Sequence, residues 1–93
     1  VPQDNKEAIR WYRLAADQGS TMAQRSLGFM YTKGKGVPPD DVQAYAWYSL
    51  AAANGDNSAT LHKDARAEKM TPEQITRAQE LSTELHKKIS EAK

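Results

Sequence analysis

The sequence predicts an all-α fold in which antiparallel helix pairs stack into a solenoid. Three observations lead to this prediction: an internal repeat, regularly placed signals for helix starts and ends, and the absence of any strand pattern. Shifted by 36 residues, the chain is identical to its own beginning at 11 of the first 23 positions, including the adjacent pair Trp11-Tyr12, which returns as Trp47-Tyr48. Units of about 20 to 50 residues that recur at a fixed period bury their apolar faces by stacking on copies of themselves.

Length, charge and composition narrow the classes of function. With 93 residues the chain holds one small domain, and a domain of this size buries only about 60–65% of its extended surface. The net charge of +1 gives no strong field for phosphate backbones, so we expect no nucleic acid partner. No run approaches the roughly 18 apolar residues of a membrane span, so we expect no direct membrane insertion. The absence of cysteine excludes a disulfide, a thiolate nucleophile and a zinc–thiolate site.

Two helices are predicted at matching places in the repeat. Asp4 and Asp40 each place a side-chain acceptor over the free N–H groups of a new helix, with an acid or amide three residues later. Gly19 and Gly55 follow the two Trp-Tyr-x-x-Ala-Ala segments, where a left-handed residue ends a helix without a Cβ penalty. The predicted helices span about residues 5–18 and 41–54.

Another helix is predicted between these two, and a weaker one after them. The apolar residues of the first are spaced by three and four, as one buried face requires. They are Met22, Ala23, Leu27, Met30 and Tyr31. The Gly-Lys-Gly-Val-Pro-Pro loop at 34–39 ends this helix, because glycine permits the reversal and proline lacks the N–H that a helix interior needs. The weaker helix is predicted from about residue 58 to 69.

The last helix is predicted to be long and amphipathic. Thr71 caps it, with Pro72 at its first position and Gln74 three residues after the cap. Its apolar face, at spacings of three and four, comprises Ile75, Ala78, Ser82, Leu85, Ile89 and Ala92, with Leu81 widening the stripe. Its other face carries i,i+4 pairs of opposite charge, which are Glu73 with Arg77 and Glu84 with Lys88.

The middle of the chain carries a specific motif. It reads Ala23-x-x-x-Leu27-Gly28-x-x-Tyr31-x-x-Gly34-x-Gly36-Val37-x-x-Asp40-x-x-x-Ala44-x-x-Trp47-Tyr48-x-x-Ala51-Ala52-x-x-Gly55. This motif resembles the Sel-1-like repeat, a relative of the tetratricopeptide repeat, and with the half-repeat before it the resemblance covers about 55 of the 93 residues. The resemblance implies a right-handed α/α superhelix that serves as a scaffold for protein partners rather than as a catalyst, in a family with many bacterial members.

The resemblance divides this single domain into three parts. Residues 1–19 match the second half of a repeat and residues 20–55 a complete repeat, whereas residues 56–93 depart from the pattern. Because a terminal repeat needs a polar outer face, we expect residues 56–93 to be C-terminal capping helices. The helix that should cover Trp11 and Tyr12 is missing, so we expect a truncated fragment that self-associates through an uncapped N-terminal face.

The repeated aromatic and small residues are predicted to build the fold rather than a ligand site. Both Trp-Tyr pairs are expected inside one apolar seam, where alanines let helices approach closely. The repeat positions assigned to packing and turns are Trp11, Tyr12, Gly19, Ala23, Leu27, Gly28, Tyr31, Gly34, Gly36, Asp40, Ala44, Trp47, Tyr48, Ala51, Ala52 and Gly55.

Three groups of polar residues suggest chemistry, and a simpler explanation is favoured for each. The Gly-Lys-Gly at 34–36 lacks the glycine–lysine spacing of a nucleotide loop and has no strand before it. Ser58, His62 and Asp64 are residue types of a hydrolase, but Asp64 projects about 200° around the helix from His62, and a polar surface is expected there. His86 has no second ligand at i+4, so we expect no metal site there. From the three groups together we expect no metal, no cofactor and no catalytic residue.

The predicted function is that of a non-enzymatic protein–protein interaction scaffold. The resemblance implies that the first helix of each unit lines a concave surface that binds a protein or peptide, and on this helix the free positions are Met22, Arg25, Phe29, Thr32 and Lys33. Phe and Arg are favoured as anchors because both residue types dominate interface energetics. The resemblance leaves two alternatives open: a structural spacer of a larger envelope protein, and part of a cell-wall or β-lactam-active hydrolase. The compartment also stays open between the bacterial cell envelope or periplasm and the cytoplasm.

Overall fold

The computed structural model describes residues 4–91 of the chain. Within this range the protein has five α-helices and no β-strand, and the helices are α1 (Asn5–Asp17), α2 (Thr21–Lys33), α3 (Asp41–Ala53), α4 (Asn57–Ala67) and α5 (Pro72–Glu91). The all-α prediction is confirmed, and the predicted bounds of α1, α3 and α4 are met within two residues. Ala92, predicted to extend the apolar face of the last helix, lies outside the described residues.

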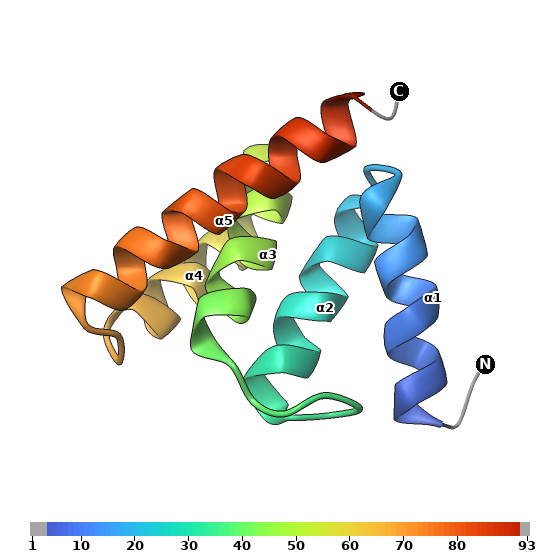
Figure 1. Ribbon diagram of the computed structural model, residues 1–93, viewed down its shortest axis with the longest axis horizontal. Coiled ribbons are helices and arrows are strands. Elements are labelled where there is room, and N and C mark those ends of the chain that lie inside the picture. The colour runs from blue at the N-terminus through green and yellow to red at the C-terminus, as the bar shows by residue number, and fades with distance from the viewer. Residues whose placement is uncertain (1–3, 92–93) are drawn as a thin grey trace.

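The central helix of the stack is α3. From α1 to α4, consecutive helices pack against each other, and α5 returns across the stack to pack on α3 and to approach α1. Figure 1 shows α1, α2 and α3 side by side, with α4 behind α3 and α5 running across them. Because α2, α4 and α5 all pack on α3, its residues are buried on several sides, including an unbroken run from Ala44 to Tyr48.

Each helix begins at a side chain that accepts a hydrogen bond from the backbone of its first turn. Asp40 accepts from the N–H of Gln43 at 3.1 Å. Thr71 and Gln74 form a reciprocal capping box, with distances of 2.9 and 3.1 Å. The remaining helices are capped by Asp4, Ser20 and Asp56. Each such cap stabilises a helix by about 1 kcal/mol.

The helices α1 and α3 end in the same way. Gly19 and Gly55 have φ angles of 97° and 98°, so both glycines adopt the positive φ predicted for them. After α1, the N–H groups of Gly19 and Ser20 donate hydrogen bonds to carbonyls in the last turn of that helix, at 3.0 and 3.1 Å. The residues after α3 repeat this pattern. This pair of backbone hydrogen bonds is a Schellman motif. The repeat in the sequence is therefore also a repeat in backbone geometry.

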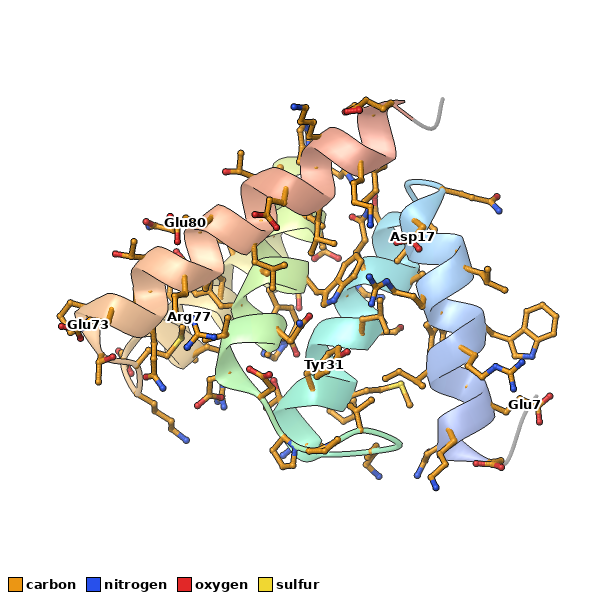
Figure 2. All side chains as sticks on the ribbon, viewed as in Figure 1. Glu7, Asp17, Tyr31, Glu73, Arg77 and Glu80 are labelled. Carbon is orange, nitrogen blue, oxygen red and sulfur yellow. The ribbon has the colours of Figure 1, made fainter. Side chains whose placement is uncertain are left out.

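The main core forms around Trp47, whose side chain is completely buried. Four helices contribute to this cluster, and its other buried members are Ala16, Ala23, Leu27, Ala46, Leu50, Leu85 and Ile89. Tyr31, between α2 and α3, packs against its edge (Figure 2). The guanidinium carbon of Arg13 on α1 lies 5.1 Å from the centroid of the Trp47 ring, which is a cation–π contact. Trp47 therefore joins α1, α2, α3 and α5.

Trp11 has a different environment from its counterpart in the repeat. The residue is 59% exposed, and Leu14 beside it is 57% exposed. The prediction that both tryptophans lie inside one apolar seam is therefore wrong for Trp11. The physical reason is that Trp47 has α1 against it, whereas within residues 4–91 α1 itself packs mainly on α2, and its other side stays open.

Gly28 allows α2 and α3 to approach closely. A Cβ atom built at this position would lie 2.7 Å from ring carbons of Tyr48, which is too short for an unstrained contact. The glycine of the repeat motif is therefore explained by the space that the aromatic ring of the following helix occupies.

Replacement of Gly28 by alanine is expected to lower the free energy of unfolding by about 1–3 kcal/mol, because the methyl group overpacks this contact. Without the ring, Gly→Ala inside a helix stabilises by about 1 kcal/mol, so the sign of the effect identifies the clash. Urea denaturation followed by circular dichroism measures the change. In a Tyr48→Leu background Gly28→Ala should become neutral or stabilising, and an equal loss in both backgrounds would contradict this explanation.

Candidate functional site

A groove of about 450 Å³ opens between α1, α2 and α4. Its volume falls within the roughly 300–1,000 Å³ of typical ligand sites. The residues that line it are Asn5, Ala8 and Tyr12 of α1, Arg25, Ser26, Phe29 and Met30 of α2, Tyr48 of α3, Ser58 and His62 of α4, and Lys35 of the loop between α2 and α3. The groove is therefore built by two successive helix pairs rather than by one.

Two of the predicted partner-binding residues lie in the groove. Arg25 and Phe29 are four positions apart on α2 and so share one face of the helix. Both side chains line the groove, and Phe29 is 45% exposed. The groove thus has an aromatic ring available for contact beside a guanidinium group.

The other three predicted residues lie outside the groove lining. Met22 is 61% exposed in the first turn of α2, and Lys33 is exposed at the last position of that helix. The hydroxyl of Thr32 donates to the carbonyl of Gly28 at 2.8 Å and is only partly exposed. The structure therefore brings Arg25 and Phe29 together and leaves the others at separate places along α2.

Asp56 holds Arg25 in place. Its Oδ2 accepts a hydrogen bond from Nη1 of Arg25 at 3.1 Å, and its Oδ1 accepts from the N–H of Ala59 at 3.0 Å. The side chain of Asp56 is 10% exposed and that of Arg25 is 45% exposed. The same carboxylate therefore caps α4 and ties α2 to the start of α4, while much of the guanidinium stays open to solvent.

Tyr48 and His62 form a wall of the groove that sequence reasoning missed. Their rings stack with centroids 5.1 Å apart and planes inclined by 19°. Tyr48 was assigned to packing alone, and His62 was expected on a purely polar surface. His62 is exposed, as expected, but its surroundings are not purely polar, because its ring stacks on Tyr48 and lines the groove. The signal was the i,i+4 spacing of Ser58 and His62, which places both on one face of α4.

The hydroxyl of Tyr48 stays neutral under ordinary conditions. Burial raises its pKa above the usual value of 10.0, whereas the Thr32 hydroxyl and the positive charges of Arg66 and Arg25 oppose this effect more weakly. Tyr48 therefore contributes no charge to the groove.

The groove does not assemble a hydrolytic triad. Ser58 and His62 both line it, but Asp64 is exposed and is not among the lining residues. The third group that would orient a histidine base is therefore not supplied by Asp64. Within residues 4–91 no group of three or more His, Cys, Asp or Glu side chains is placed to hold a metal ion.

The loop between α2 and α3 serves the fold. Gly34 and Gly36 have φ angles of 72° and 79°, and a Cβ atom at Gly36 would collide with the backbone carbonyl of Asn5. Both glycines are thus explained by the turn, and Gly36 also by its close approach to the start of α1, without a phosphate. Lys35 between them lines the groove. No helix in the described part of the chain has both the length and the apolar character needed to cross a bilayer.

Helix pairs that repeat in sequence and geometry, with a groove formed across them, define an α/α solenoid of the helical-repeat class. The Sel1 repeat model matches residues 1–20 and 21–56, which is more than half of the chain. The chain therefore belongs to the Sel1 repeat family. Proteins of this family are typically interaction scaffolds and generally bind protein partners.

A solved structure has the same fold. It is the c5321 protein, a protective antigen of uropathogenic Escherichia coli strains that displays an SLR fold, with a TM-score of 0.90 and 38% sequence identity to this chain. The match covers 96% of this chain and 19% of the antigen, so the chain spans about a fifth of that protein's length. No curated protein matches the chain.

The raised pKa of Tyr48 predicts a loss of stability in alkaline solution. Above pH 10 an unfolded tyrosine ionises while buried Tyr48 stays protonated, so ionisation favours the unfolded state until the folded pKa is passed. Across this window the free energy of unfolding should fall by up to about 1.4 kcal/mol per pH unit from this group. Urea titrations at pH values from 9 to 11, in steps of about half a pH unit, measure the free energy of unfolding. This free energy should decline less steeply with pH in Tyr48→Phe than in the wild-type chain. Equal slopes for both proteins would contradict the assignment.

Proposed function

We propose that the chain is a non-enzymatic interaction module that binds a segment of a protein partner in the groove between α1, α2 and α4, the predicted concave face. The observation that carries this proposal is the half-exposed ring of Phe29 beside Arg25 in that groove. Covering an aromatic ring that is open to water lowers the free energy of the complex. Aromatic and arginine side chains are also enriched in protein interfaces. We include Met22, Thr32 and Lys33, on the same helix, as flanking contacts of a longer partner.

The division of the chain predicted from the sequence is part of this proposal. Residues 1–19 are the second half of a repeat, residues 20–55 a complete repeat and residues 56–93 the capping helices. The charged residues Glu73, Arg77 and Glu80, which project from α5 (Figure 2) and are exposed, support a capping role. A solenoid that ends in such a surface does not recruit another repeat there.

Phe29→Ala is expected to remove partner capture while leaving the helical fold unchanged. The chain is immobilised and exposed to lysate of the source cells, and retained proteins are quantified by mass spectrometry. Retention of the partner should fall about tenfold to thirtyfold, the effect of losing an anchor worth about 1.4–2 kcal/mol. Arg25→Glu should add to this loss.

Leu61→Ala is the matched control. Leu61 lies on α4, is 73% exposed and is not part of the groove lining, so its removal deletes a similar apolar area elsewhere. A partner retained equally by wild type, Leu61→Ala and Phe29→Ala would remove the groove from the interface.

We also propose that copies of this chain self-associate through the N-terminal face. Trp11 and Leu14 are both more than half exposed on α1, and Glu7 and Arg10 nearby are exposed and of opposite charge. Figure 2 shows Glu7 on the side of α1 that faces away from α2. Because slightly more than half of each side chain is exposed, covering both with a second copy supplies roughly 60% of the about 1.5–3 kcal/mol that full burial of each would give.

Light scattering across a range of concentrations should detect a dimer of the wild-type chain and a monomer of Trp11→Glu. Leu61→Glu introduces the same charge at an exposed apolar residue of α4 and should still dimerise. A wild-type chain that stays monomeric at high concentration would overturn this proposal.

A further inference from the structure

The residues that line the groove are basic but not acidic. Arg25, Lys35 and His62 are in the lining, and no aspartate or glutamate of residues 4–91 is among them. Asp56, which contacts Arg25, is mostly buried, and its two oxygens accept from Nη1 of Arg25 and from the N–H of Ala59. The groove therefore presents the positive charges of Lys35 and of Arg25, the second partly balanced by Asp56, although the whole chain carries a net charge of only +1.

Apolar surface lies among these basic side chains. Phe29, Met30 and Ala8 line the groove together with Tyr12, and Phe29 is the most exposed large apolar side chain of the lining. The Cβ atoms of residues four apart on a helix are about 5–6 Å from each other, so a ligand in the groove meets the Phe29 ring and the Arg25 guanidinium within the span of two adjacent side chains.

We infer that the occupant of the groove is a peptide segment in which acidic residues flank an aliphatic or aromatic side chain. The carboxylates face Arg25 and Lys35, and the apolar side chain lies on Phe29. A guanidinium has five N–H donors, and one of those of Arg25 is used by Asp56, so donors remain for a partner carboxylate. This inference rests on the proposed function and adds the chemical class of the partner.

Charge balance favours a peptide over a nucleic acid. Proteins that hold nucleic acid through its backbone neutralise several phosphates in succession, commonly about 6–10. This chain has 13 basic and 12 acidic residues, and its groove gathers three basic side chains around an apolar centre. Such a small, mixed surface matches alternating carboxylates and apolar side chains rather than a continuous phosphate backbone.

The test is selection of random dodecapeptides displayed on phage against the folded chain, followed by fluorescence anisotropy with the selected peptides. The enriched peptides should be acidic and contain a Leu, Ile, Phe or Trp, and their affinity should fall as salt rises from about 50 to 300 mM. Lys35→Glu should weaken binding about tenfold. Lys87→Glu is the control, because it changes the net charge equally at an exposed residue of α5 and should leave binding unchanged.

The outcomes separate this inference from the proposed function. Enriched peptides that lack acidic residues but lose binding in Phe29→Ala would overturn the acidic partner while supporting the groove as a protein site. No enrichment, or enriched peptides indifferent to Phe29→Ala, would overturn both. Tighter binding of a labelled oligonucleotide than of any selected peptide, with loss in Lys35→Glu, would replace the peptide by a nucleic acid. Circular dichroism of each variant confirms that binding is compared between folded proteins.

Discussion

The burial of Trp47 at the meeting point of four helices is the constraint on which the rest of the structure depends. The ring has α2 and α5 around it and the guanidinium of Arg13 from α1 over it. Replacing a buried tryptophan by alanine costs about 3–5 kcal/mol, which is comparable with the whole stability of a small domain. Because α3 carries this ring and also packs on α4, the contact fixes the helices that enclose the groove on both sides.

The close packing around α3 also explains which small residues the repeat requires. Gly28 leaves room for the Tyr48 ring, and that ring in turn supports His62 at the groove wall. A residue that sequence reasoning assigns to packing can therefore shape a binding surface through the side chain stacked on it. The ring of Tyr48 therefore packs in the core against α2 and also supports a side chain of the groove wall.

Much of the fold could be predicted from the sequence because its signals are local. Helix caps and positive φ angles depend on residues within one turn of their own position, as at Asp40, Thr71, Gly19 and Gly55. They can therefore be predicted without knowing which helices lie nearby. The environment of Trp11 could not be predicted in the same way. Repetition showed that Trp11 and Trp47 are equivalent in sequence, but burial depends on which helix lies outside each ring, and that is a property of the stack.

The candidate site was predictable only in part for a related reason. Arg25 and Phe29 were predicted because the resemblance points to the first helix of the unit, whereas Tyr48, Ser58 and His62 reach the groove from other helices. These residues come together because of how successive helix pairs are placed relative to each other. The spacing of residues along one helix does not contain that information. The i,i+4 relation of Ser58 and His62 showed a shared face but not what that face touches.

The double role of Asp56 has a mechanical consequence for a longer array. Because one carboxylate both starts α4 and holds the arginine of α2, the separation between neighbouring hairpins sets the position of a groove side chain. When the separation of the two hairpins changes, Arg25 follows Asp56 as long as this hydrogen bond holds. The curvature of the array and the position of Arg25 in the groove are thereby linked.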